Sequence, residues 1–552
     1  MKKKETTNKK EKLLVGNELI GTIDIVKSGD GFVIIDDVKK DIYIHKSNTN
    51  TAFDGDTVKV KRVHNPKSTK KEGVVTEIIK RKRTHFIGIV DKQSNFCFVR
   101  PDLNSINVDF FISKKDEQNV KHNDKVVVQF KEWRKKDKNP TGIITEVLGQ
   151  AGGNDIEMQS ILIDNGFFTS FPEEVLKEAE EISIKISNSE IKKRKDFRDT
   201  LTITIDPDDA KDFDDAISFQ KITDDIFQIG VHIADVSHYI QENTALDDEA
   251  IKRATSVYLV DRVAPMFPEH ISNIVCSLRP NEDKLCFAAV FMIDKNAKIL
   301  ETWYGRTVIH SNKRFTYNEA QEVIEGKSQL YADEITILNT IAKKLRKNRF
   351  NNGSINFDAP ETKFKLDEHG KPIGIFVKER KDAHMLIEEF MLLANRSVAQ
   401  FIGKEKNATG KVPMVYRIHD MPNMEKLQDF ALFAARFGYK IQFDNPKQIA
   451  RSLNILMEKI QGTPEQNVLE SLAIRSMAKA IYTIKNIGHY GLGFEFYTHF
   501  TSPIRRYPDV MVHRLLQAIL EGKKLPDVKD MEQNVSIVVN VKRLLPKQNA
   551  HQ

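Results

Sequence analysis

Six aspartates lie within ten residues of this sequence, between Asp206 and Asp215. The segment follows a β-branched run at residues 202–205, and Pro207 stops the strand ladder, so we expect a compact loop at a strand end. Carboxylates this close repel one another unless cations neutralise them. Mg²⁺ prefers oxygen ligands and leaves positions for water and phosphate, and two such ions about 4 Å apart can clamp a phosphodiester. The pattern favours a catalytic metal site, with a solvated acidic loop or a Ca²⁺ site as the alternative.

A second cluster of polar residues lies near residue 500, where residues 499–507 read His-Phe-Thr-Ser-Pro-Ile-Arg-Arg-Tyr. Ser502 and Pro503 predict a helix start, with Arg505 and Arg506 in its first turns. A helix N-terminus attracts anions, and arginine adds a bidentate fork for phosphate. Arginine opposes the helix dipole there, which indicates a role other than helix stability. An ordinary surface arginine pair is the alternative.

The spacing of the cysteines and histidines argues against a zinc site. The three cysteines lack C-x-x-C spacing, which argues against a disulfide framework or a cysteine zinc site and favours reduced thiols. His232, His238 and His384 do not have zinc-motif spacing either, so we interpret them as structural. We find no secretory signal and no apolar run long enough to span a bilayer, and therefore expect a cytoplasmic protein without membrane contact.

The elements before the acidic loop form an internal repeat. Asp-Ile-Tyr-Ile at residues 41–44 is answered 68 positions later by Asp-Phe-Phe-Ile at residues 109–112, and Gly-Asp-Thr-Val-Lys-Val at residues 55–60 is answered at the same offset. Each unit consists of short β-branched runs separated by turn residues. This pattern predicts two small antiparallel barrels.

The excess of positive charge lies in the first 150 residues, which contain these barrels. Of 552 residues, 40% are hydrophobic, and the formal net charge is +7. Residues 1–150 contain 31 Lys and Arg against 21 Asp and Glu, whereas the remainder is slightly acidic. A basic module on a near-neutral body indicates a polyanionic partner such as nucleic acid. A merely soluble, lysine-rich surface is the alternative.

The first barrel resembles the cold-shock version of the OB-fold, in which aromatic and histidine side chains stack on single-stranded bases. Phe32, Tyr43 and His45 occupy the matching positions, and we favour a stacking platform over simple filling of the barrel. The second barrel matches less well. We expect its aromatics to be mostly core: Phe96, Phe98, Phe110 and Phe111.

Taken together, the patterns predict a multidomain chain with two all-β OB-fold barrels followed by a large α/β catalytic domain. We expect long helices at residues 383–400, 424–437 and 465–482. The predicted segments are a disordered basic tail at residues 1–14, barrels at 15–83 and 84–150, a helical connector at 151–200, the catalytic domain at 201–530 and an atypical tail at 531–552.

The acidic motif, Tyr-Arg-Ile-His-Asp-Met-Pro at residues 416–422 and the motif at residues 499–514 together resemble the ribonuclease II/ribonuclease R family of exoribonucleases, with its RNB domain. The resemblance runs from about residue 15 to about residue 525, and the basic tail favours the ribonuclease R branch. It implies processive 3′→5′ hydrolysis of single-stranded RNA to 5′-nucleoside monophosphates, and it leaves open whether structured RNA is also degraded. It also implies Mg²⁺ as the cofactor, with Mn²⁺ as the alternative, and RNA 3′ ends as the partner. We expect a monomer.

The resemblance also implies residue roles. Asp206 and Asp215 match direct metal ligands, while Asp212 and Asp214 match residues that hold the metals or orient the attacking water. Arg505 matches the arginine that stabilises the scissile phosphate, with Arg506 beside it as a helper or a structural residue. The remaining matches are aromatic residues that contact RNA: Tyr258 and Phe357, which sandwich terminal bases, and Tyr317 near the leaving nucleotide.

The end of the chain departs from the family pattern. The resemblance leads us to expect a further catalytic helix and a C-terminal S1 barrel, but residues 531–552 fit neither. We hypothesise a truncated or frameshifted product. The competing functions are then an exoribonuclease, which the four aspartates favour, and an RNA-binding or unwinding protein with weakened catalysis, which the tail favours. A DNA exonuclease is a third, less favoured alternative.

Overall fold

The computed structural model describes residues 18–544, except residues 36–40, 64–70, 104, 169, 357–360, 369–371 and 408–409. The predicted basic tail at residues 1–14 and Phe357 lie outside the described residues. The chain forms two compact units, Met1–Phe167 and Phe168–Gln552, and the boundary falls inside the segment predicted as a connector. In the part of the chain that the structure describes, no helix is long and apolar enough to cross a membrane.

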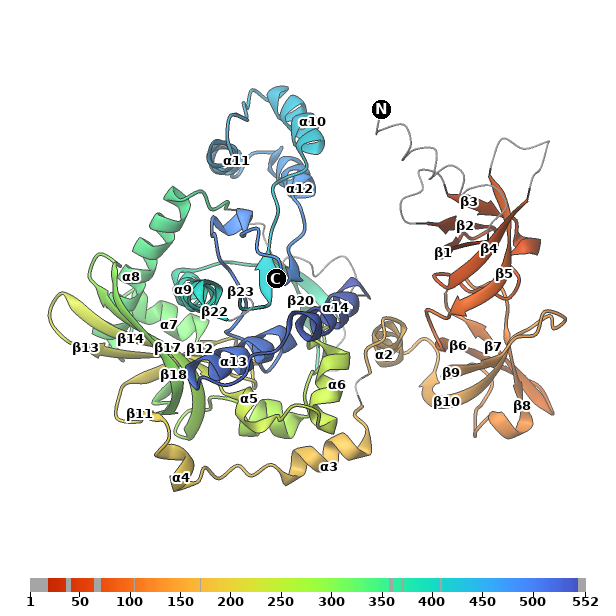
Figure 1. Cartoon of the computed structure of the whole chain (residues 1–552), viewed down its shortest axis with the longest axis horizontal. Helices are drawn as coiled ribbons and strands as arrows, with labels where there is room; N and C mark the ends of the chain where they lie inside the picture. The colour runs from red at the N-terminus through yellow and green to blue at the C-terminus, as the bar shows by residue number, and fades with distance from the viewer. Residues whose placement is uncertain are drawn as a thin grey trace. The chain divides into compact units, whose positions relative to one another are not determined.

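The first unit contains two closed barrels of five strands, with strand orders β1-β2-β3-β5-β4 and β10-β8-β7-β6-β9 (Figure 1). This confirms the paired OB-type barrels predicted from the repeat. The strands are β1 (Leu19–Ile25), β2 (Gly31–Ile34), β3 (Ile42–Ile44), β4 (Thr57–Val63), β5 (Glu72–Lys80), β6 (His85–Lys92), β7 (Phe96–Pro101), β8 (Phe110–Ser113), β9 (Asp124–Glu132) and β10 (Thr141–Gln150).

The two barrels share a hydrophobic contact. Phe53 of the first barrel is 4% exposed and packs within the core of the second, with its ring 5.0 Å from that of Phe86. The guanidinium of Arg81 lies over the Phe53 ring at 4.7 Å and forms an ion pair with the buried Asp56. Helix α2 (Asn154–Asp164) belongs to this unit.

The second unit is built on a mixed seven-stranded sheet with strand order β11-β18-β17-β14-β13-β12-β19. The near-continuous apolar runs of its central strands are buried, as expected for a sheet covered on both faces. The strands are β11 (Lys195–Phe197), β12 (Thr202–Asp206), β13 (Asp215–Lys221), β14 (Ile226–Ala234), β17 (Asp283–Asp294), β18 (Ile299–His310) and β19 (Lys313–Thr316).

Among the described residues of this unit, helices and four short two-stranded sheets complete the fold. The helices are α3 (Glu173–Glu181), α4 (Asn188–Ile191), α5 (Val236–Tyr239), α6 (Ala245–Arg253), α7 (Tyr317–Ile324), α8 (Ala332–Asn351), α9 (Asp382–Lys404), α10 (Met424–Ala435), α11 (Pro446–Ile460), α12 (Gln466–Ser476), α13 (Tyr507–Leu520) and α14 (Val528–Leu544). The paired short strands are β15 (Val257–Tyr258) with β16 (Val263–Ala264), β20 (Glu361–Leu366) with β21 (Pro372–Lys378), β22 (Lys406–Asn407) with β23 (Gly410–Lys411), and β24 (Tyr416–Ile418) with β25 (Ile481–Thr483).

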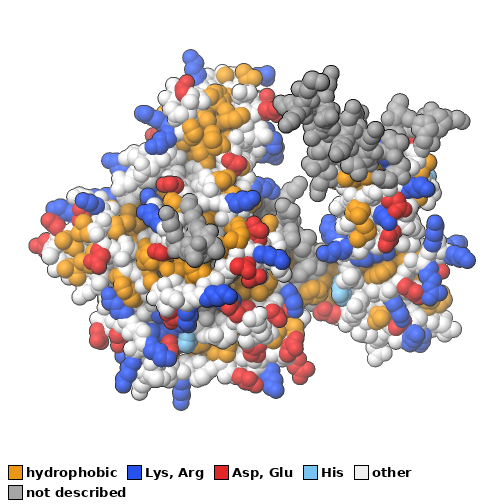
Figure 2. All heavy atoms as spheres, in the orientation of Figure 1, with side chains coloured by type: hydrophobic (Ala, Val, Ile, Leu, Met, Phe, Trp, Pro, Cys, Tyr) orange, Lys and Arg blue, Asp and Glu red, His pale blue; other side chains and the backbone are white. Residues whose placement is uncertain are grey.

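Helices α10, α11 and α12 form a separate group with a hydrophobic core of its own (Figure 1). The surface of this group also carries apolar side chains, among them Leu432, which is 72% exposed, and Figure 2 shows hydrophobic atoms gathered there.

One prediction about the later helices is wrong. The helix expected at residues 465–482 ends at Ser476, and residues 481–483 form strand β25, which pairs with β24. Residues 531–552 fit neither the catalytic helix nor the S1 barrel that the resemblance implies, and the structure shows that α14 continues through this segment to Leu544. Met531, Val535 and Val538 recur at helical spacing and are buried in the main core, so packing of one apolar face stabilises this helix.

Candidate active site

The pairing of three strands brings the predicted carboxylates to one edge of the sheet. Strand β12 ends at Asp206, which lies opposite Thr316 of the parallel neighbour β19. Strand β13 runs antiparallel to β12 and begins at Asp215, so its first residue is at the same edge. Tyr317 directly follows β19 and starts α7 there. The sheet register therefore gathers residues from three segments of the chain.

Successive side chains of the loop between β12 and β13 have different surroundings. Phe213 is 8% exposed and packs into the main core. Its neighbours carry polar contacts: Asp212 accepts a hydrogen bond of 3.1 Å from the Tyr258 hydroxyl, and Asp214 is buried. The loop begins as an exposed turn at Asp208 and Asp209, and by Asp212 it lies close enough to the strand end that, beside the larger effect of burial, the charge of Asp212 raises the pKa of Asp206.

Asp214, which belongs to the acidic motif, contacts two residues of the motif near residue 500. Its Oδ1 accepts a hydrogen bond of 2.8 Å from the backbone N–H of Ile504, and its Oδ2 lies 3.7 Å from Nε of Arg505. The Arg505 side chain is 41% exposed and also donates to the Ser502 hydroxyl at 3.2 Å. The predicted carboxylate and phosphate-binding motifs therefore meet, and Arg505 keeps a surface accessible to a ligand.

The site holds more negative charge than its arginines neutralise. Burial raises the pKa of Asp206 to about 8, and the charge of Asp215 adds to this rise while Arg314 opposes it. Burial raises the pKa of Asp215 to about 6, with Arg505 and Arg506 acting in the opposite direction. Burial also raises the pKa of Asp214 well above its usual range. A bound cation would favour the ionised form of each.

The donor set fits a hydrated magnesium ion. Oδ2 of Asp206 is buried and has no hydrogen-bond partner among the described residues, so this oxygen is available to a cation. The described residues form no group of three His, Cys, Asp or Glu side chains that could hold a metal by itself. Mg²⁺ commonly binds through one or two carboxylates together with water and substrate phosphates. Asp206 and its neighbours Asp212, Asp214 and Asp215 fit that mode better than an all-protein calcium cage.

The helix start predicted at Ser502 is wrong. Helix α13 begins at Tyr507 rather than near Ser502, because Arg506 has an extended backbone and bridges to Thr255. The Arg506 guanidinium donates to the buried Asp509 at 2.8 Å, and its side chain is 14% exposed. Asp509 also accepts a hydrogen bond from the Ser502 N–H. This internal ion pair favours the structural alternative for Arg506, whereas the Arg505 guanidinium pairs with Asp214.

Two of the three predicted aromatic residues lie at the site. Tyr258 is 40% exposed and is held through its hydroxyl by Asp212. Tyr317 is stacked on His384 of α9, with ring centroids 4.0 Å apart and an angle of 11° between the planes. Burial, and then the charges of Asp215 and Asp206, raise the pKa of the Tyr317 hydroxyl. The third, Phe357, lies outside the described residues.

Histidines and cysteines of this unit contact other residues of the fold. His232 is fully buried between the hydroxyls of Ser218 and Thr307, and burial lowers its pKa to about 3. His238 lies 3.7 Å from Glu190. Cys276 and Cys286 are buried free thiols. These residues take part in packing and hydrogen bonding within the fold.

The aromatic residues of the barrels can be divided into those in a barrel core and those on an outer face. Phe32 and Tyr43 are cross-strand neighbours with ring centroids 5.6 Å apart, both are half-buried, and His45 is exposed. In the second barrel, Phe110 is core, but the expectation that its companions are core is wrong. Because strand residues alternate, Cys97 and Val99 fill the interior, and the half-buried rings on the outer face contact one another: Phe96, Phe98 and Phe111.

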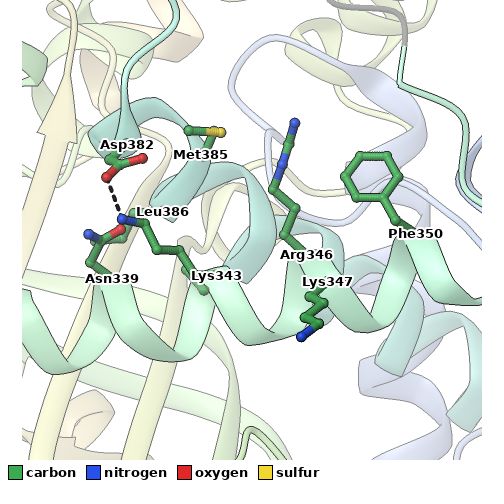
Figure 3. A pocket seen from close by; sticks show the side chains of 9 residues that line it. Asn339, Lys343, Arg346, Lys347, Phe350, Asp382, Met385 and Leu386 are labelled. Atoms are coloured by element: carbon green, nitrogen blue, oxygen red, sulfur yellow. Dashed lines mark ion pairs between the residues drawn. The ribbon is translucent and has the colours of Figure 1, made fainter. Parts of the chain in front are cut away.

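A separate groove of about 290 Å³ lies between α8 and α9. Figure 3 shows Lys343, Arg346, Lys347 and Phe350 along α8. Lys343 forms an ion pair with Asp382 of α9, with an N–O distance of 2.6 Å. None of the predicted site residues lines this groove.

Three family models match the chain in the order of its domains. They are the Ribonuclease B OB domain over residues 21–78, the Cold shock domain over residues 98–172 and the RNB domain over residues 194–522. The last match alone covers more than half of the chain. The chain belongs to the RNB family of ribonucleases. The resemblance seen in its motifs is thereby confirmed.

Relatives within the RNB family are similar over most of the chain. Ribonuclease R of Aquifex aeolicus is 37% identical over 517 residues, which cover 92% of this chain and 72% of that protein. The structure of Mycoplasma genitalium RNase R in complex with ribose-methylated single-stranded RNA matches with a TM-score of 0.85 at 28% identity, over 95% of this chain and 84% of that one. Yeast Ssd1, described as a pseudonuclease, shares the fold at 20% identity, with a TM-score of 0.70 over 98% of this chain and 74% of that one. An RNB fold therefore does not by itself establish catalysis, and the site residues must decide.

Two residues that hold the acidic loop were missed by the sequence analysis. Arg314 donates to the carbonyls of Pro207 and Asp208, and Ser277 contacts the backbone of Lys211 and Phe213. Arg314 belongs to the Arg-Phe-Thr-Tyr segment that contains Tyr317, which was the available signal. Ser277 had none, because only the fold brings it to the loop.

Proposed function

We propose that this RNB-family exoribonuclease hydrolyses single-stranded RNA from its 3′ end, processively, and releases 5′-nucleoside monophosphates with the help of Mg²⁺. One observation carries the proposal: Asp206, Asp212, Asp214 and Asp215 meet at one sheet edge, with Arg505 against Asp214. The relatives named ribonuclease R support the same reaction class.

The carboxylates would hold the cation, with Asp206 and Asp215 as direct ligands and Asp212 and Asp214 holding it or orienting the attacking water. Bound Mg²⁺ would neutralise the phosphate and lower the pKa of water. Mn²⁺ would bind the same oxygen ligands. The partly exposed guanidinium of Arg505 offers N–H donors to the scissile phosphate, whose charge grows in the transition state.

The aromatic residues suit a substrate of any sequence. Tyr258 and Tyr317 present rings beside the carboxylates, and stacking is tolerant of base identity because every base has a π face. The outer pair Phe32 and Tyr43, with His45 next to it, offers a second surface of the same kind on the first barrel. We propose RNA as the partner of both surfaces and a monomer as the active form.

The test uses the full chain, Mg²⁺ and a 3′-tailed RNA, with a DNA strand of the same sequence beside it. Asp214→Asn is compared with Asp209→Asn, which makes the same change at an exposed carboxylate of the same loop. We expect the wild type and Asp209→Asn to release monophosphates from RNA and Asp214→Asn to release none. Equal RNA binding by all three without release would instead support an RNA-binding protein with weakened catalysis. Preferred release from the DNA strand would support a DNA exonuclease.

A further inference from the structure

The loop that carries the carboxylates is fixed by side chains at both of its ends. At the first end, Nη2 of Arg314 donates to the carbonyl of Pro207 and, at 3.1 Å, to that of Asp208. At the second end, the Ser277 hydroxyl donates to the Lys211 carbonyl at 2.7 Å and accepts from the Phe213 N–H at 3.0 Å. These backbone contacts do not depend on which side chains the loop carries.

Both residues are in turn held by the fold. Arg314 lies on β19 opposite Thr204 of β12, two residues before Asp206, and its guanidinium faces the Phe213 ring at 5.5 Å. Ser277 is fully buried, and the N–H of the next residue, Leu278, donates to the Phe213 carbonyl at 3.0 Å. The two supports therefore belong to rigid parts of the domain.

The loop needs such support because it would not keep this conformation by itself. The loop and the two strand residues that flank it carry six aspartates, which repel one another, and ordering each loop residue costs conformational entropy. Within the loop, the one backbone hydrogen bond among the described residues joins Ala210 N–H to Pro207. The guanidinium of Arg314 binds the carbonyls of the two residues that follow Asp206, and its positive charge offsets the local excess of negative charge.

We infer that Arg314 and Ser277 are positioning residues, which hold residues 207–213 so that Asp212 and Asp214 face Asp206 and Asp215. Both side chains bond to the backbone of the loop, so they act on the carboxylates through the loop. The inference rests on the proposed function for its effect on catalysis, but the loop geometry itself can be measured without any turnover.

The test compares Arg314→Met and Ser277→Ala with Arg314→Lys and with Arg436→Met. The last makes the same chemical change at an exposed arginine directly after α10 and is the matched control. Hydrogen–deuterium exchange of the peptide at residues 207–213 reports the loop, and titration with Mn²⁺ alone, followed by electron paramagnetic resonance, reports the metal site. RNA turnover at saturating metal then separates kcat from KM.

We expect faster exchange of the loop peptide in Arg314→Met and Ser277→Ala, and Mn²⁺ affinity lower by about 10- to 100-fold, the usual effect of losing a supporting residue behind a metal ligand. We expect kcat to fall with KM for RNA unchanged, partial recovery in Arg314→Lys, and no change in Arg436→Met. Unchanged loop exchange and Mn²⁺ affinity in both Arg314→Met and Ser277→Ala would overturn the inference. If the wild type releases no nucleotide while the loop effects persist, the proposed function fails and the positioning role stands.

Discussion

Replacing Asp206 by asparagine should stabilise the metal-free protein while it abolishes catalysis. In the folded state the pKa of this carboxyl is raised from 3.8 to about 8, chiefly by burial and then by Asp215. A raised folded-state pKa means that the folded protein binds the proton more tightly than the unfolded chain does. The carboxyl therefore costs no free energy of unfolding at low pH, where it is protonated in both states, and this cost grows as the pH rises towards 8. Asparagine cannot ionise and never carries this cost.

The magnitude follows from linkage. Between about pH 5 and about pH 8 the cost grows by about 4 kcal/mol, at about 1.4 kcal/mol per pH unit. Any pH-independent difference between aspartate and asparagine cancels in this comparison. The advantage of Asp206→Asn in free energy of unfolding should therefore be about 4 kcal/mol larger at the higher pH.

The assay is urea unfolding in a metal chelator at the two pH values. Trp303 lies on β18 of the catalytic sheet, and Trp133 lies in the barrel unit, so a Trp133→Phe background leaves a fluorescence reporter for the catalytic unit alone. Asp209→Asn serves as control, because Asp209 is exposed. An advantage of Asp206→Asn that stays constant or shrinks with rising pH would refute the assignment of buried, uncompensated charge to Asp206.

Three further changes test other parts of the structure. Arg505→Met should lower kcat by about 100-fold, the usual effect of losing one donor to developing charge, and an unchanged single-turnover rate would rule out its phosphate role. Phe32→Ala with Tyr43→Ala should weaken binding of single-stranded RNA by about 1–3 kcal/mol for each stacked base in a fluorescence anisotropy titration, and unaltered affinity would show that the pair only packs on the barrel. Val538→Asp places a carboxylate where α14 is buried and should lower the free energy of unfolding by about 3 kcal/mol or more, whereas a surface-like effect below about 0.5 kcal/mol would mean that α14 does not pack as described.

The sequence predicted the parts of the site that follow local rules. A repeat with one offset revealed both barrels, and six aspartates after a β-branched run marked a loop at a strand end. The same reasoning found Arg505, but it placed the helix start at Ser502, because Ser-Pro is a common start signal. The structure begins α13 at Tyr507, since Asp509 accepts from the Ser502 N–H and pairs with Arg506.

What the sequence did not predict depends on contacts between distant segments. Ser277 reaches the acidic loop across 64 residues to Phe213, and no local pattern marks it. The outward direction of Phe96, Phe98 and Phe111 follows from the register of β7 and β8, which runs of aromatics do not reveal. Helix α14 exists because one face of it is covered by the core, whereas the Val-rich sequence alone has weak helix propensity.

The most direct test of the account is the oxygen isotope content of the product formed from RNA in water labelled with oxygen-18. Hydrolysis at the carboxylate site forms a bond between the water oxygen and the terminal phosphorus, breaks its bond to the 3′ oxygen of the preceding nucleotide, and leaves a proton on that oxygen. We predict 5′-monophosphates that carry one labelled oxygen, released from the 3′ end by the wild type and absent with Asp214→Asn. Unlabelled products, release from the 5′ end, or equal release by Asp214→Asn would contradict the account.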